Sequence, residues 1–165
     1  MFRALAVALF ALALTACHRG PDPALLQANA AAARAFMDKT AGEAGVQALP
    51  SGVLYRVVSS GPASGRSPRP ADDVKVHYEG KLVSGEVFDS SFERGAPEVM
   101  RLKGLIPGWV EALQKMKPGD EWILYVPPEQ GYGQREAGPI PPNSVLIFRI
   151  QLIDALPAAG STALG

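Results

Sequence analysis

The chain has 165 residues and a mass of 17.4 kDa, which suits one compact domain with short appendages. Its 16 basic and 16 acidic residues give a net charge of +0, so we expect no nucleic-acid partner and no binding to an anionic membrane by charge alone. One cysteine and two histidines exclude a disulfide framework and leave too few ligands for a metal centre.

The chain begins with the pattern of a secretory signal peptide. Arg3 precedes an unbroken apolar run over residues 4–14, and small residues follow at positions 15 and 16. Such a run is too short to span a bilayer, and its basic start and small-residue exit are typical of a cleaved signal. We therefore expect residues 1–16 to be a signal peptide.

Residues 14–17, Leu-Thr-Ala-Cys, resemble a bacterial lipobox, in which the cysteine becomes the lipidated first residue of a mature lipoprotein. Lipidation of Cys17 would remove the liability of an unpaired thiol in an oxidising compartment. We expect a protein of the bacterial cell envelope whose only membrane contact is this anchor. Because His18 is not the aspartate of inner-membrane sorting, the expected location is the outer membrane, facing the periplasm. The alternative is ordinary secretion with an incidental thiol.

An alanine-rich segment follows the expected anchor. Leu25, Ala32 and Phe36 recur at near-helical spacing, which predicts a short helix over residues 24–39 within a lipid-anchored leader of residues 17–45. The apolar stripe of this helix is too thin for a coiled coil. We expect the helix to rest on the domain or to act as a spacer.

The segment from residue 46 to residue 154 has the pattern of a single domain rich in strands. The clearest strand covers residues 73–83, where Val74, Val76 and Tyr78 alternate with polar residues. A turn at residues 84–85 leads into the next strand. The expected strands cover residues 52–59, 73–83, 86–89, 99–102, 121–126 and 145–154.

One amphipathic helix is expected within this domain. Pro107 suits the first turn of a helix, and Trp109, Leu113 and Met116 recur at i, i+4 and i+7. The expected fold class is therefore α+β, with an antiparallel sheet of about five strands wrapped around this short helix.

A long segment rich in proline and glycine separates the last two expected strands. It covers residues 127–144, which is unusually long for a loop of a compact domain and therefore favours a functional role. Residues 155–165 show no periodicity, and we expect them to form a flexible tail.

The domain lacks the common catalytic motifs. It contains no Gly-x-Ser-x-Gly, and its only histidine, His77, lies on the polar side of its strand. Gly131 and Gly133 could begin a dinucleotide fingerprint, but Glu136 stands where its third glycine should be. What stands out instead is a set of apolar side chains that either fill the core or line a concavity. They are Tyr78, Phe88, Ile106, Trp109, Tyr132, Ile140 and Phe148.

Six sequence blocks carry a specific family resemblance. Two of them are Val-His-Tyr-Glu-Gly at residues 76–80 and Val-Phe-Asp-Ser-Ser at residues 87–91. Together with residues 105–109, 132–133, 138–142 and 146–148, they resemble in order and spacing the FKBP-type peptidyl-prolyl cis-trans isomerases. The match runs from about residue 52 to residue 154. It implies an FKBP-like fold, isomerase activity and no cofactor.

The resemblance also implies the site. Asp89 and the Tyr132 hydroxyl would lie at the rim of a pocket, and the Ile106 backbone N–H would bind a substrate carbonyl, so these three are the expected catalytic residues. Asp89 would either act on the rotating carbonyl by its charge or anchor Tyr132. The expected substrate-binding residues are Tyr78, Phe88, Leu105, Trp109 (the pocket floor), Ile140 and Phe148.

One position departs from the family pattern. Glu98 falls where the family usually has a large apolar residue, and Met100 supplies the nearest apolar side chain. The composition of one pocket wall stays open at this point, and with it the preference for the residue before proline.

The implied chemistry needs neither a nucleophile nor a metal. An X-Pro bond prefers the trans form by only about 0.5 to 1 kcal/mol, but its rotation must cross a barrier of about 18 to 20 kcal/mol because the amide loses conjugation. A planar amide is more dipolar than a twisted one, so a dry apolar pocket disfavours the ground state more than the transition state. The expected partners are proline-containing polypeptides, and macrolide inhibitors are candidate ligands by the same resemblance.

Two other functions remain open from the sequence. The same aromatic groove could bind proline-containing chains as a chaperone or docking module without turnover, or the domain could only mediate contacts of an envelope lipoprotein. Because the N-terminal helix is short beside the long dimerising helices of some periplasmic relatives, we expect a monomer.

Overall fold

The computed structural model describes residues 20–157. The expected signal peptide, Cys17 and residues 158–165 lie outside the described residues. No helix between residues 20 and 157 is long and apolar enough to cross a membrane. The elements are α1 (Pro23–Ala41), β1 (Val46–Ala48), β2 (Leu54–Ser59), β3 (Asp73–Leu82), β4 (Val87–Ser90), β5 (Glu98–Arg101), α2 (Pro107–Leu113), β6 (Glu121–Val126) and β7 (Leu146–Leu156), with short 3-10 turns at Leu102–Gly104 and Pro128–Gln130.

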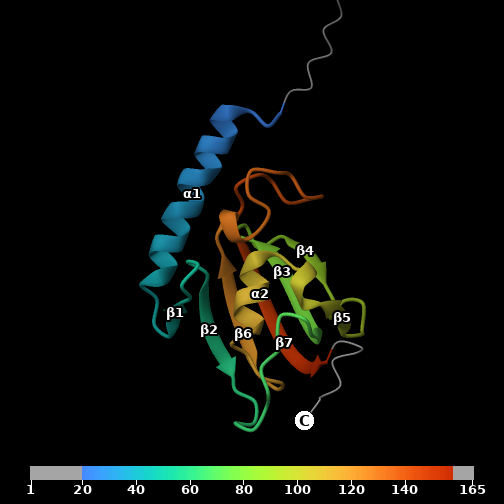
Figure 1. Cartoon of the computed structure of the whole chain (residues 1–165). Helices are drawn as coiled ribbons and strands as arrows, with labels where there is room; N and C mark the ends of the chain where they lie inside the picture. Colours follow the sequence, from blue (N-terminus) through green and yellow to red (C-terminus); the bar gives the residue numbers. More distant parts are fainter. Residues whose placement is uncertain (1–19, 158–165) are drawn as a thin grey trace, which may run out of the picture.

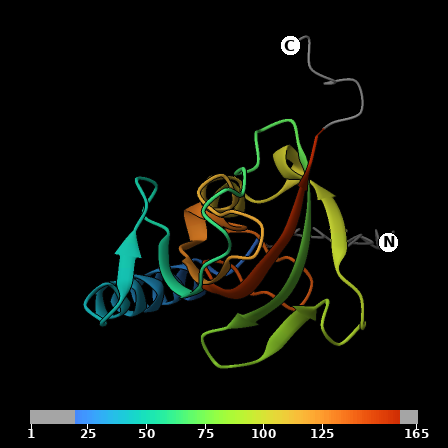
Figure 2. The same ribbon diagram turned by 90° about the horizontal axis from the view of Figure 1, so that it is seen from below.

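The seven strands form one antiparallel sheet. Its order is β1-β2-β6-β7-β3-β4, and β5 also pairs with β3. The long central pair is β3 and β7, whose register runs from Asp73 opposite Leu156 to Leu82 opposite Leu146. Figures 1 and 2 show α2 lying against one face of this curved sheet. The expected α+β class is confirmed.

The sheet contains seven strands, whereas the sequence predicted a sheet of about five and six segments in strand conformation. The additional strand is β1, which has three residues and pairs with β2 through Val46 opposite Arg56. Three residues are too few to show an alternation of apolar and polar side chains. The short strands β4 and β5 each pair separately with β3, so β3 has three neighbours.

The ends of two elements differ from the expected boundaries. α1 begins at Pro23 because the Asp22 side chain accepts a hydrogen bond of 2.9 Å from the Ala24 N–H and so caps the helix. At the other end of the chain, Ala155 pairs with Val74, and Leu156 pairs with Asp73. These two residues of the expected tail therefore belong to β7.

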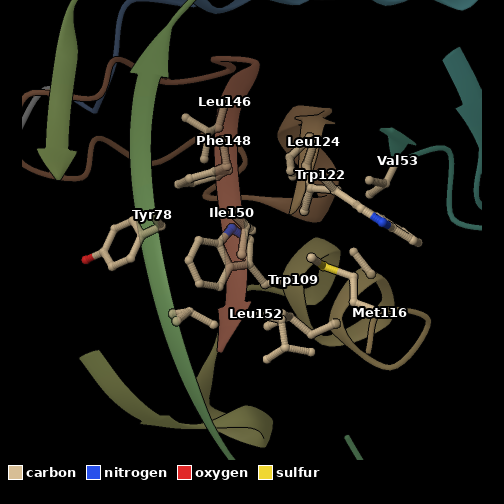
Figure 3. Packing of buried hydrophobic residues seen from close by; sticks show 14 of the residues in the cluster. Val53, Tyr78, Trp109, Met116, Trp122, Leu124, Leu146, Phe148, Ile150 and Leu152 are labelled. Atoms are coloured by element: carbon tan, nitrogen blue, oxygen red, sulfur yellow. The ribbon is translucent and has the colours of Figure 1, made fainter. Parts of the chain in front are cut away.

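The core lies between α2 and the sheet. Trp109 and Leu113 of α2 are 4% and 0% exposed, and Met116 is fully buried just beyond the helix end. They pack with side chains of the central strands, among them Leu124 and Ile150 (Figure 3). The spacing that predicted the helix therefore also identified its buried face.

Candidate active site

A cavity of about 320 Å³ opens beside α2 and is lined by all nine residues expected at the site. Strands β3, β4, β5 and β7 contribute to its wall, as do the segment of residues 104–109, which leads into α2, and the loop of residues 127–144. The structure therefore brings together residues from six separate segments. The lining residues are Tyr78, Phe88, Asp89, Met100, Gly104, Leu105, Ile106, Trp109, Tyr132, Ile140 and Phe148.

Four aromatic rings form a continuous edge-to-face cluster in this cavity. The Trp109 ring meets Tyr78 at a centroid distance of 5.2 Å and Phe148 at 5.1 Å, with interplanar angles of 84° and 85°. Phe88 meets Phe148 in the same way at 5.7 Å and 88°. Edge-to-face contacts fix the orientation of each ring as well as burying it. The cavity therefore has a rigid, apolar wall.

The indole of Trp109 is the ring of this wall that contacts both Tyr78 and Phe148. Its Nε1 atom is the one buried side-chain nitrogen or oxygen in residues 20–157 that has no hydrogen-bond partner. Because this atom has almost no exposed surface, Trp109 offers the cavity an aromatic surface and no hydrogen-bonding group.

Gly80 makes room for two of these rings. It lies opposite Phe148 in the pairing of β3 with β7, and a Cβ atom at this position would lie 2.6 Å from the Phe88 ring and 2.7 Å from the Phe148 ring. Real Cβ atoms do not approach other heavy atoms so closely. The absence of a side chain at Gly80 is therefore a condition for the aromatic wall.

A polar triangle lies at the edge of the apolar cavity. The Tyr78 hydroxyl donates a hydrogen bond of 2.5 Å to Asp89 Oδ2. Arg94 donates from Nη1 to Asp89 Oδ1 at 2.5 Å and from Nη2 to the Tyr78 oxygen at 3.0 Å. Asp89 is therefore held by Tyr78 and Arg94. The expectation that it anchors Tyr132 is not met, since no hydrogen bond joins the two side chains in the described structure.

Burial and the hydrogen bonds of this triangle determine the protonation states of Tyr78 and Asp89. Burial and the neighbouring Asp89 raise the pKa of Tyr78 to about 12. Burial alone would raise the pKa of Asp89, but the hydrogen bonds from Tyr78 and Arg94 outweigh it and lower that pKa below its ordinary value. At neutral pH the site therefore combines an ionised carboxylate with a neutral phenol.

The other two expected catalytic groups lie elsewhere on the cavity wall. Tyr132 stands on the long loop and is 36% exposed. Ile106 is the residue immediately before α2, where its carbonyl accepts from the Trp109 N–H at 3.0 Å. Within residues 20–157, the Ile106 N–H donates no hydrogen bond. The unpaired N–H of Ile106 and the partly exposed phenol of Tyr132 thus border the same cavity as Asp89.

A sequence model described as FKBP-type peptidyl-prolyl cis-trans isomerase matches residues 64–153, more than half of the chain. The chain belongs to the FKBP-type peptidyl-prolyl cis-trans isomerase family. The matched segment contains every residue that lines the cavity.

Individual relatives agree with the family match. The peptidyl-prolyl cis-trans isomerase Mip of Coxiella burnetii is 48% identical over 126 residues, covering 76% of this chain and 54% of that protein. The outer membrane protein MIP of Legionella longbeachae is 42% identical over 132 residues, covering 79% of this chain and 56% of that protein. The chain spans about half the length of the curated relatives it matches.

A solved structure shows the same fold. The crystal structure of FkpA from Escherichia coli superposes with a TM-score of 0.77 at 41% sequence identity, covering 81% of this chain and 62% of that one. The FKBP-like fold expected from the sequence is therefore confirmed.

The position that departs from the FKBP pattern has a clear place in the structure. Glu98 and Met100 lie on the same face of β5, but only Met100 lines the cavity. Glu98 instead accepts a hydrogen bond of 2.9 Å from Arg94 Nε. The apolar wall is thus supplied by Met100, and the carboxylate of Glu98 joins the polar triangle at the rim.

Sequence reasoning missed Arg94 and the role of Gly80. Arg94 lies in a turn between two strands, where an exposed arginine has no special signal; only its i,i+4 spacing to Glu98 suggests an ion pair. Gly80 could have been suspected because a glycine inside a regular strand often marks a close approach. His77, in contrast, does not line the cavity: its Nδ1 lies 2.9 Å from Ser91 Oγ, and its ring stacks on Phe92.

Proposed function

We propose that this protein accelerates the cis-trans rotation of X-Pro peptide bonds in polypeptides of the bacterial envelope. The observation that carries the proposal is the apolar cavity of about 320 Å³, walled by four fixed aromatic rings and bordered by one ionised carboxylate. A prolyl ring and its amide suit a cavity of this size and polarity better than a charged or strongly polar ligand does.

The aromatic wall supports the rate-enhancing part of the proposal. Trp109, Tyr78 and Phe148 are between 4% and 7% exposed, so a bound amide would leave water on entering. Loss of water destabilises the dipolar planar amide relative to the twisted one, and fixed rings need no rearrangement during the rotation. Catalysis would therefore follow from the pocket itself, without a covalent intermediate.

The polar groups would hold the substrate in the twisted state. The Ile106 N–H and the Tyr132 hydroxyl are the donors available to substrate carbonyls, and a hydrogen bond that strengthens on twisting lowers the barrier. Asp89 would act by its negative charge, because its two oxygens are already engaged by Tyr78 and Arg94. This arrangement favours the electrostatic role of Asp89 over a role as a proton donor or acceptor.

A protease-coupled assay or an NMR exchange measurement on a proline-containing peptide tests the proposal. We expect Asp89→Asn and Tyr132→Phe each to lower kcat/KM by about tenfold without loss of folding. The matched controls are Asp38→Asn and Tyr55→Phe, whose side chains lie away from the cavity. Full activity of a combined Asp89→Ala, Tyr132→Phe and Phe148→Ala variant would refute the assigned site.

The same measurements distinguish the rival function. A wild-type protein that binds the peptide but leaves its exchange rate unchanged would be a non-catalytic proline-binding or chaperone module. Macrolide inhibitors are candidate ligands of the cavity. They should compete with the peptide for binding whether or not the protein is catalytic.

We also propose that Cys17 carries a lipid anchor that holds the domain of residues 46–154 at the outer membrane, facing the periplasm. The lipobox-like sequence before Cys17 and the relative named as an outer membrane protein support this location. Cys17→Ser should move the protein from the membrane fraction to the soluble periplasm, and an unchanged distribution would refute lipidation. Light scattering of the Cys17→Ser protein tests the expected monomer.

A further inference from the structure

The N-terminal helix α1 is attached to the domain in two different ways. Its C-terminal half packs against the sheet, where the Phe36 ring lies 6.3 Å from the Tyr125 ring and Thr40 is 2% exposed. Its N-terminal half lies beside the loop of residues 127–144, drawn in orange near the blue end of the helix in Figure 1. This second contact leads toward the candidate active site.

Two asparagines make the contact between α1 and the loop. The Asn29 amide donates a hydrogen bond of 2.8 Å to the Pro142 carbonyl, and the Asn143 amide donates one of 2.8 Å to the Leu26 carbonyl. Asn29 and Asn143 are the only asparagines in the chain. Asn29 of the helix binds the backbone of the loop, and Asn143 of the loop binds the backbone of the helix. More than 110 positions of sequence separate the two partners of each bond.

Two cavities border this contact between α1 and the loop. A cavity of about 270 Å³ lies on one side of the contact and a cavity of about 310 Å³ on the other, and both are bordered by Ala33 and Asn143. The small Ala33 side chain fills neither of them. The two amides make the side-chain hydrogen bonds that join helix and loop within residues 20–157.

Asn143 also binds the part of the loop that lines the catalytic pocket. Its backbone has a φ of 56°, the left-handed region, and its N–H donates a hydrogen bond of 2.7 Å to the Gly133 carbonyl. Gly133 directly follows Tyr132, and Ile140 lies three residues before Asn143. The Asn143 N–H thus closes the part of the loop that supplies both Tyr132 and Ile140 to the cavity wall.

We infer that Asn29 and Asn143 are positioning residues, through which α1 holds the pocket loop in the geometry that binds substrate. Neither side chain lines the cavity, so both act through Tyr132 and Ile140. The inference rests on the proposed isomerase function for its kinetic consequence. The mechanical coupling between α1 and the loop is independent of that function.

Substitutions in the full-length protein test the inference. Asn29→Ala removes one amide bond, and alanine is the better helix former, so the change does not weaken α1 itself. Asn29→Asp keeps the side-chain size but replaces the donating group by an acceptor. Asn143→Gly retains the left-handed backbone and removes the other amide. Gln27→Ala is the control, because Gln27 is exposed on the same helix and makes no such bond.

The first measurement separates kcat from KM for peptide isomerisation. Loss of either amide should raise KM by about fivefold, since Ile140 of the loop contacts the bound substrate, and should lower kcat as well, since the Tyr132 hydroxyl on the same loop stabilises the twisted amide. A contact that only stabilises the fold would lower the unfolding midpoint and leave KM unchanged. An unchanged KM in both Asn29→Ala and Asn143→Gly would overturn the inference.

The second measurement does not need catalysis. Hydrogen exchange followed by mass spectrometry should show faster exchange across residues 131–143 in Asn29→Ala and Asn29→Asp, with β6 and β7 unchanged and Gln27→Ala like wild type. Equal exchange in all four proteins would overturn the coupling. If wild type shows no isomerase activity, the proposed function fails, and this exchange pattern together with peptide affinity still decides whether α1 positions the loop.

Discussion

The phenol of Tyr78 donates a hydrogen bond of 2.5 Å to Asp89. This bond joins the aromatic wall of the pocket to Asp89, the only ionised residue among those that line the cavity. The Tyr78 ring meanwhile packs edge-to-face against the Trp109 ring of the wall. One side chain therefore sets both the position of a ring and the charge distribution at the rim. Its hydroxyl can be removed without removing the ring.

Tyr78→Phe should separate these two roles. The phenylalanine keeps the contact with Trp109, but Asp89 loses one of its two side-chain donors and is then held by Arg94 alone. We expect the free energy of unfolding to fall by about 1 kcal/mol and kcat/KM to fall by about three- to tenfold. Urea denaturation and the peptide assay measure the two effects.

Tyr55→Phe is the matched control for this variant. The Tyr55 hydroxyl also donates to a side chain, Gln47 at 2.9 Å, but the bond is exposed and far from the cavity. Its loss should leave kcat/KM unchanged. Equal activity of Tyr78→Phe and wild type would show that the orientation of Asp89 does not matter for the rotation.

The pKa values predict a broad pH range of activity. Since the pKa of Asp89 is lower in the folded protein, its stabilising effect is present above the ordinary carboxyl value of 3.8 and is lost as the pH falls through the folded value. Since the pKa of Tyr78 is raised from 10.0 to about 12, its effect is present below pH 10 and is lost as the pH rises toward 12.

We therefore expect kcat/KM to stay level between about pH 5 and pH 9. Chemical denaturation at each pH and the ultraviolet absorbance of tyrosinate measure the two limits, with Tyr78→Phe identifying the contribution of Tyr78. A step in activity near pH 6 to 7 would contradict the electrostatic role of Asp89.

The sequence predicted the fold class and the apolar residues that line the cavity. Alternation along β3 placed Tyr78 correctly on the buried face, and helical spacing placed Trp109 in the core. Both signals are periodic patterns along the chain, so they can be recognised without knowing which residues lie nearby in the folded protein. The motif resemblance then supplied Phe88, Phe148 and Ile140, which no periodicity distinguishes from ordinary core residues.

Features that depend on contacts between distant segments were not predictable in the same way. The Arg94 side chain reaches Tyr78 and Asp89 only because β3 and β4 bring them together. Asn29 and Asn143 meet only after the whole domain has formed. The strand β1 depends on its pairing with β2 rather than on its own composition. In each case the information lies in tertiary geometry.

Gly80→Ala should disrupt the aromatic wall without changing any wall residue. The new methyl group would lie 2.6 Å from Phe88 and 2.7 Å from Phe148, so both rings must move. Overpacking of this kind costs about 1 to 3 kcal/mol. Because the displaced rings occupy the cavity, we expect kcat/KM to fall by more than about tenfold. Thermal unfolding and the peptide assay measure the two effects.

Gly42→Ala is the control for this substitution. Its Cβ would make only an ordinary contact of 3.5 Å with the Lys39 carbonyl, at the end of α1 and away from the cavity. Normal activity of Gly80→Ala, despite a changed stability, would show that the pocket tolerates a shift of Phe88 and Phe148.

Glu98 should influence which residue the enzyme prefers before proline. Arg94 bridges Asp89 and Glu98, so the rim carries two carboxylates and one guanidinium, a net charge of about −1. Peptides with lysine before proline should therefore react about two- to threefold faster than peptides with glutamate at low salt, and the ratio should shrink as salt screens the charge.

Glu98→Gln tests this charge effect directly, because glutamine keeps an oxygen that can accept the hydrogen bond from Arg94 Nε. Once position 98 is uncharged, the opposite charges of Asp89 and Arg94 balance, so the ratio of the rates for lysine and glutamate peptides should fall to about one. Glu43→Gln removes the same charge near the end of α1 and should leave the ratio as in wild type. A ratio that does not respond to Glu98→Gln would assign the preference to Met100 and the apolar wall instead.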